Sequence, residues 1–155
     1  MNNPLRTSED YELFLYTLSE QFPSVRRSSV TFIRRGASLA RVAGELYFDD
    51  EIRLVVRERL VYDRFPVVID SYGYEVWRGG EKLYWYDSQP HPDDTVLRST
   101  DPHHKHIPPN IKHHRIPAPR MSFTRPNLPT LIREIEGVIH NIESDIGPKQ
   151  DELSL

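Results

Sequence analysis

The feature that most constrains the fold is a regular alternation of apolar and polar residues along the first half of the chain. In Ser38–Phe48, Ile52–Phe65 and Val67–Ser88, apolar or small side chains fall on every second position over long stretches. Successive side chains of a β-strand point to opposite faces of the sheet, so this period of two predicts strands with one buried face. The chain must therefore cover one face of a sheet.

Glycines separate the predicted strands. Gly36 lies between Ser28–Arg35 and the next alternating run, which predicts a hairpin, while Gly79 and Gly80 divide Val67–Ser88 into two strands. We expect roughly five strands in chain order, and such a meander favours an antiparallel sheet.

An amphipathic helix is predicted before the strands. Between Ser8 and Phe22, apolar residues recur at helical spacing, and Pro23 ends the pattern. Thr7 or Ser8 can accept the N-cap hydrogen bond.

A second amphipathic helix is predicted at Leu128–Ile142, where apolar residues follow i, i+3, i+4, i+7 spacing and Asn127 can serve as the N-cap. We expect both helices to pack on one face of the sheet, which gives a single α+β domain over residues 1–147. Residues 148–155 are expected to form a flexible C-terminal tail.

Composition excludes several classes of protein and site. The chain has no cysteine, so disulfides, thiolate nucleophiles and cysteine-bound zinc are excluded. It lacks an apolar run near the roughly 20 residues that a membrane span needs, and its N-terminus lacks the pattern of a secretion signal. A net charge of −3 carries no global signature of nucleic-acid binding. We expect a cytoplasmic protein without a membrane partner.

A long segment rich in proline and histidine, Gln89–Asn127, interrupts these patterns, and we expect it to be a loop that lies along a sheet edge or across the open face. It holds eight of the 13 prolines, and five of the seven histidines fall between His103 and His114. Leu97–Arg125 carries a formal charge of +5, against −8 for the rest of the chain. This separation of charge would attract a polyanion, although a solvated loop has a similar composition.

The histidines can be interpreted as a metal site. In an extended segment His104 and His106 project to the same side and can chelate one ion, with His113 or His114 as a third ligand. Against this interpretation stand Lys105, placed between the two histidines, and the surrounding arginines, because positive charge raises the cost of binding a dication.

The same residues can be interpreted as a metal-free site for RNA cleavage. Attack of a 2′-hydroxyl on the adjacent phosphate needs one neutral and one protonated histidine, for which His103, His104 and His106 are candidates. Lys105 or Arg115 could stabilise the phosphate oxygens as negative charge builds on them.

Two carboxylates and a set of tyrosines complete the candidates. Asp87 ends a predicted strand and Glu58 lies in the middle of another; either could raise the pKa of a histidine. Four tyrosines share one strand parity, which indicates either core packing or a stacking surface for unpaired bases. They are Tyr72, Tyr74, Tyr84 and Tyr86.

Several motifs resemble the TumE-like toxins of bacterial and archaeal toxin–antitoxin modules. They are LxVxE with Glu58, YxY with Tyr72 and Tyr74, YD followed by a histidine (Tyr86, Asp87, His91), and above all PHHKH at Pro102–His106. The resemblance runs over roughly Ala43–Glu136. By motif it selects Glu58, Tyr74, Asp87, His91, His103, His104, Lys105 and His106.

The resemblance implies a toxin that acts inside the cell and is neutralised by an antitoxin from a neighbouring gene. Ribonuclease action is implied by analogy with other small α+β toxins that cut RNA. Our first hypothesis is therefore a metal-independent endoribonuclease without a cofactor. The predicted catalytic residues are His103, His104, His106, Lys105, Glu58 and Asp87. The predicted substrate-binding residues are Tyr74, His91, Lys112, His113, His114, Arg115 and Arg120.

Two alternatives remain at this point. One is a metal-dependent nuclease or hydrolase in which His104, His106 and Asp87 hold zinc or manganese. The other is a non-catalytic module that binds nucleic acid or a partner protein. The sequence also leaves open whether the protein forms a homo-oligomer.

Overall fold

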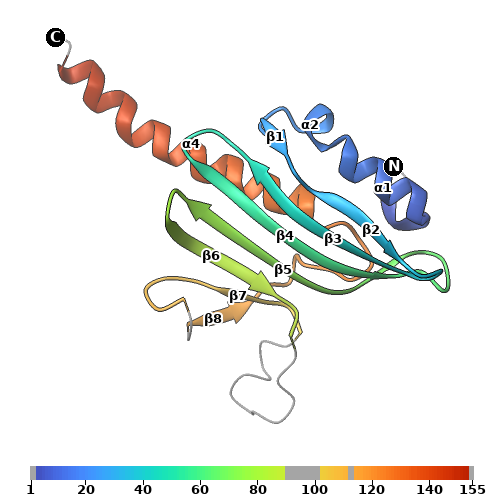
Figure 1. Ribbon diagram of the computed structural model, residues 1–155. Coiled ribbons are helices and arrows are strands. Elements are labelled where there is room, and N and C mark those ends of the chain that lie inside the picture. The colour runs from blue at the N-terminus through green and yellow to red at the C-terminus, as the bar shows by residue number, and fades with distance from the viewer. Residues whose placement is uncertain (1–2, 90–101, 112–113, 154–155) are drawn as a thin grey trace.

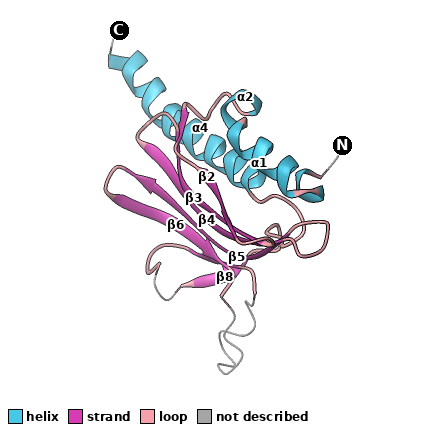
Figure 2. Cartoon of the chain, turned by 45° about the vertical axis from the view of Figure 1, so that its right-hand side comes forward, coloured by secondary structure: helices cyan, strands magenta, loops and turns pink. Residues whose placement is uncertain are grey.

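An antiparallel sheet carries the described helices on one of its faces (Figures 1 and 2). The computed structural model describes residues 3–89, 102–111 and 114–153. The helices are η1 (Pro4–Arg6), α1 (Ser8–Tyr16), α2 (Leu18–Gln21) and α4 (Leu128–Leu153). The strands are β1 (Arg27–Ser28), β2 (Thr31–Arg35), β3 (Leu39–Tyr47), β4 (Ile52–Val61), β5 (Val68–Arg78), β6 (Glu81–Asp87), β7 (His104–His106) and β8 (Arg115–Pro117).

The sheet follows the chain as a meander. Its strand order is β1-β3-β4-β5-β6-β7-β8, with β2 also paired to β3, and every pair is antiparallel. The predicted α+β class and antiparallel sheet are confirmed, but the expected number of strands, roughly five, is too low, because the described residues form eight. The additional strands are β1, which is too short to show a pattern, and the edge pair β7 and β8.

The edge pair comes from the segment that was expected to be a loop. His104 pairs with Asp87 of β6 on one side and with Pro117 of β8 on the other. Pro117 is the last residue of β8, and a proline is tolerated in an edge strand because its missing N–H interrupts no interior ladder. The expectation that the segment lies along a sheet edge is confirmed for this part.

The N-terminal helix is divided. Thr7 caps it as predicted, because its Oγ1 accepts a hydrogen bond from the Asp10 amide at 3.0 Å. At Thr17 the backbone leaves helical geometry, and the Thr17 hydroxyl donates to the Leu13 carbonyl at 2.8 Å. Such side-chain bonds compete with the helical ladder. The single helix predicted over Ser8–Phe22 is therefore two helices, α1 and α2.

The C-terminal helix begins at Leu128 as predicted and continues to Leu153, past the expected end of the domain at residue 147. The side chain of Asn127 ties the preceding loop to the sheet. Its Oδ1 accepts from the Ser122 amide at 2.8 Å, and its Nδ2 donates to the Tyr74 hydroxyl at 3.0 Å. The start of α4 is therefore anchored on β5.

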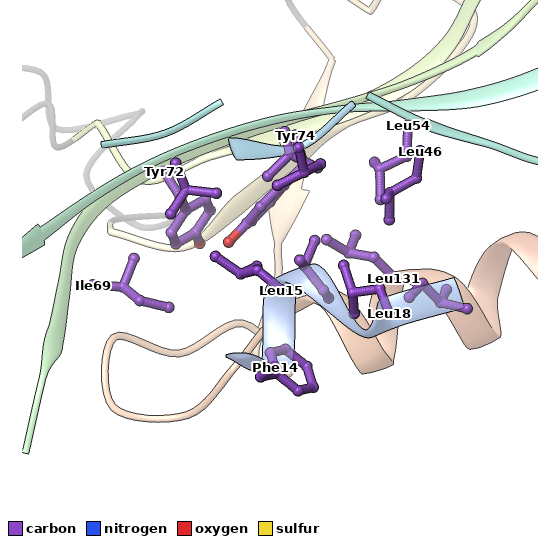
Figure 3. Packing of buried hydrophobic residues seen from close by; sticks show 14 of the residues in the cluster. Phe14, Leu15, Leu18, Leu46, Leu54, Ile69, Tyr72, Tyr74 and Leu131 are labelled. Atoms are coloured by element: carbon purple, nitrogen blue, oxygen red, sulfur yellow. The ribbon is translucent and has the colours of Figure 1, made fainter. Parts of the chain in front are cut away.

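The core lies between the sheet and the helices. Figure 3 shows Tyr72, Tyr74, Leu46 and Leu54 pointing from the strands toward the helices, where they meet residues such as Leu131. We call this side of the sheet the helix face and the opposite side the open face. All four tyrosines of the sequence motif are buried there, which supports the core interpretation: Tyr72, Tyr74, Tyr84 and Tyr86.

Candidate functional site

Three side chains that could bind a metal or transfer protons meet where β6 pairs with β7. Asp87 is in register with His104, and Trp85 with His106, so strand alternation places all of them on the open face. The His104 Nε2 atom contacts Oδ1 of Asp87, and the His106 Nε2 atom lies 3.6 Å from Oδ2. One ligand atom of each lies within 4.8 Å of the others. We call Asp87, His104 and His106 the Asp–His–His cluster.

The two histidines of the cluster are buried, and the His106 ring is held by its neighbours. His104 is 0% exposed and His106 5%. The indole of Trp85 stacks on the His106 ring, with centroids 3.6 Å apart and planes 5° from parallel. The Trp85 Nε1 atom donates to the Ile111 carbonyl at 3.2 Å, which fixes the indole in turn. These contacts limit the orientations that the His106 imidazole can adopt.

The pKa shifts of Asp87 and His106 favour an ionised aspartate beside a neutral His106 imidazole. Burial alone would raise the pKa of Asp87, but the hydrogen bond and charge of His104, with the charge of His106, lower it. Burial lowers the pKa of His106 to about 4, because the attraction of Asp87 is opposed by His104 and Arg115. A neutral imidazole and a carboxylate are the forms that bind a metal or accept a proton.

An arginine lies across the sheet from the cluster. Arg57 of β4 pairs with Gly73 of β5, and Gly73 pairs in turn with Asp87 of β6. The three residues therefore lie in one row across the sheet. A Cβ atom on Gly73 would come within 2.7 Å of Arg57 Nη2, so the missing side chain lets the guanidinium lie over the β5 backbone. Arg57 and Asp87 line one open hollow of about 700 Å³ on this face.

Arg115 lies on the other side of the cluster. It is in register with His106, and its charge contributes to the lowered pKa of that histidine. The predicted substrate-binding residue Arg115 is therefore brought to the cluster. His114 is exposed, and its Nδ1 lies 3.1 Å from the Pro108 carbonyl oxygen.

The PHHKH motif is divided between the two faces of the sheet. Lys105 points to the helix face, where its Nζ lies 3.4 Å from Oε1 of Glu134 and 4.3 Å from the ring centroid of Tyr84. His103 lies on the same face, with its Nδ1 2.6 Å from the Tyr72 hydroxyl. The structure therefore does not bring Lys105 and His103 together with His104 and His106.

Glu58 and Tyr74 belong to the core. The Glu58 carboxylate is 4% exposed and accepts hydrogen bonds from Tyr11, at 2.5 Å, and from Tyr74. Burial raises the pKa of Glu58, although the two hydroxyls oppose this effect. The structure places both residues on the helix face, away from the Asp–His–His cluster.

The remaining predicted residues lie elsewhere. Arg120 lines a second hollow of about 780 Å³ beside the start of α4, together with Arg125 and Arg133. Predictions for His91, Lys112 and His113 fall outside the described residues.

The sequence interpretation missed Arg57, Gly73 and Trp85. A glycine inside a strand often marks a close approach of another group, so Gly73 carried a usable signal. Arg57 could have been assigned to the open face by parity, but its proximity to the cluster depends on the pairing of three strands. Trp85 carried no such signal, because its contact with His106 depends on the pairing of β6 with β7.

Comparisons with known proteins place these observations in a family. The family model described as toxin TumE matches residues 15–139, which is most of the chain. Neither the curated proteins nor the solved structures contain a significant match. Within the described residues, no helix is both long and apolar enough to cross a membrane.

Proposed function

The chain belongs to the TumE toxin family, and from this premise we propose that it is the toxin of a toxin–antitoxin pair and that it cleaves RNA at the Asp–His–His cluster. The cognate antitoxin is its proposed protein partner. The observation that supports cleavage most directly is the convergence of Asp87, His104 and His106 beside a hollow lined by arginine.

The surroundings of the cluster suit a phosphodiester. Arg57 is 58% exposed, and its ion pair with Glu75 has an N–O distance of 3.3 Å. An exposed ion pair contributes only about 0–1 kcal/mol, so a phosphate can compete for the guanidinium at little cost. The register sets Arg115 beside His106, on the other side of the cluster from Arg57, and two arginines can bind the phosphate oxygens of one backbone.

The proposed reaction is an internal transesterification. The 2′-oxygen forms a bond to the adjacent phosphorus, and the bond from that phosphorus to the 5′-oxygen breaks. The 2′-hydroxyl gives up one proton, the departing 5′-oxygen takes one, and the products are a 2′,3′-cyclic phosphate and a 5′-hydroxyl end. Arg57 and Arg115 offset the negative charge that builds on the phosphate.

The test combines growth and RNA cleavage. We expect induced wild-type protein to arrest growth and the purified protein to cut RNA to 5′-hydroxyl ends. His106→Ala should abolish both effects. His140→Ala is the matched control, because it removes an exposed imidazole on α4.

Two results contradict the proposal. One is a purified wild-type protein that cuts no RNA from the host in which it is toxic. The other is a His106→Ala protein that remains folded by circular dichroism and still arrests growth. Weakened but persistent toxicity in that variant indicates a binding module instead of an enzyme.

A further inference from the structure

We propose that the Asp–His–His cluster binds one divalent first-row transition-metal ion through Asp87, His104 and His106. Any role of the ion in cleavage rests on the proposed function, whereas binding of the ion is a separate property that can be tested alone. The inference departs from our first, metal-free hypothesis and favours the alternative in which His104, His106 and Asp87 hold a metal.

The donor set fits such an ion. Two imidazole nitrogens and one carboxylate oxygen lie within 4.8 Å of one another, so small side-chain movements would bring all three to one centre. Catalytic zinc sites commonly use two histidines and one carboxylate, with a further position for water or substrate. Mixed nitrogen and oxygen ligands favour a transition ion over Mg²⁺, which prefers oxygen alone.

Burial separates the two candidate roles of the histidines. A general acid or base must reach the substrate within hydrogen-bond distance, directly or through one water. His104 is 0% exposed and His106 5%, so neither ring has a surface to offer a nucleotide in this conformation. A metal ligand needs no such surface, because only its lone pair must point at the ion.

The objection from Lys105 is removed by strand alternation. The sequence places Lys105 between the two histidines, but its side chain passes to the helix face and pairs there with Glu134. The cation that the register sets beside His106 is Arg115. Its charge lowers the affinity of the cluster for a dication.

The scaffold also suits a metal site. All three ligands come from paired strands, and Asp87 and His104 are directly opposite each other. Trp85 packs on the His106 ring and holds its plane, as outer groups do around many metal ligands. A bound ion would supply a water of lowered pKa and positive charge for the phosphate.

The first test measures binding without RNA. Full-length protein, purified without a histidine tag and treated with a chelator, is titrated with Zn²⁺ by calorimetry, and its Co²⁺ form is recorded by visible absorption. We expect one equivalent of Zn²⁺ and a Co²⁺ spectrum typical of low coordination number. Asp87→Asn and His104→Ala should each weaken binding by more than about 100-fold, because loss of outer-shell groups alone costs about 10–100-fold.

The control variant changes a different histidine of the PHHKH motif. His103→Ala removes the neighbouring imidazole, which lies on the helix face against Tyr72, and should leave Zn²⁺ affinity unchanged. Asp87→Asn changes the size of the side chain very little, and its folding is checked by circular dichroism. If His104→Ala does not fold, Asp87→Asn alone tests the metal site.

The outcomes separate the two proposals. Failure of the wild type to bind Zn²⁺, Co²⁺ or Mn²⁺, or unchanged binding in folded Asp87→Asn, overturns the metal site. RNA cleavage that continues in excess EDTA also overturns a catalytic ion but leaves the ribonuclease proposal intact. Stoichiometric binding without RNA cleavage supports the metal site and counts against the ribonuclease.

Discussion

Glu58 and Asp87 are carboxylates of the same sheet that lie on opposite faces, on β4 and β6. Glu58 faces the helices and accepts hydrogen bonds from the Tyr11 and Tyr74 hydroxyls. Asp87 faces outward and contacts His104 and His106. A buried carboxylate bound by hydroxyls ties elements together, whereas one placed between imidazoles beside a hollow can bind an ion or take part in proton transfer. Strand parity, not residue type, separates the two environments.

The largest expected effect separates the two carboxylates by activity. Asp87→Asn should lower RNA cleavage by at least about 10²–10³-fold, the usual range for loss of one preorganised electrostatic group. Glu58→Gln should retain most of the cleavage, because the Glu58 carboxylate faces the helices and is bound there by the Tyr11 and Tyr74 hydroxyls. Initial rates on one RNA substrate measure both. Loss of cleavage in a stable Glu58→Gln protein would restore Glu58 as a catalytic residue.

The second-largest expected effect separates Glu58 from Asp87 by their contributions to the free energy of unfolding. Glu58→Ala should lower the free energy of unfolding by about 2–6 kcal/mol, because two buried tyrosine hydroxyls lose their acceptor at about 1–3 kcal/mol each. Asp87→Ala should lower it less in metal-free protein, because its side chain is 18% exposed and its one close contact with a buried side chain, that of His104, is lost. Urea denaturation of both variants in the presence of EDTA measures the difference. Equal losses would show that Asp87 is also a structural residue.

A smaller effect on RNA cleavage tests the position of the Arg57 guanidinium over Gly73, on the same face of the sheet as Asp87. Gly73→Ala places a methyl group where the guanidinium lies, so Arg57 must shift and cleavage should fall on the order of 10-fold, as small misplacements of charged groups do. Gly80→Ala is the control, because no atom lies within 4 Å of its added Cβ. Equal rates for the two alanine variants would remove Arg57 from the proposed site.

The smallest effect concerns Lys105. Because its side chain pairs with Glu134 on the helix face, Lys105→Met should leave cleavage unchanged and lower stability by less than about 1 kcal/mol, as for other exposed or half-buried ion pairs. Kinetics and thermal unfolding of the variant measure both. A large fall in cleavage without a loss of stability would return Lys105 to the role of phosphate stabiliser that the sequence indicated.

Much of the fold followed from local patterns. The period of two in β3 to β6, the cap at Thr7 and the helical spacing after Leu128 each depend on neighbouring residues, and all correspond to elements of the structure. The division of the first helix at Thr17 and the short strand β1 escaped prediction, because each depends on interactions that a local pattern does not record.

The sequence by itself determined the family of the chain and the types of residue available for the site. The tertiary structure decided which of these residues meet. Alternation implies that His104 and His106 share one face and Lys105 takes the other, but the covered face depends on helices from both ends of the chain. Asp87 reaches the histidines through pairing of β6 with β7, across a separation in sequence that no local pattern spans. Non-local strand pairing therefore converted a histidine-rich segment into a defined cluster.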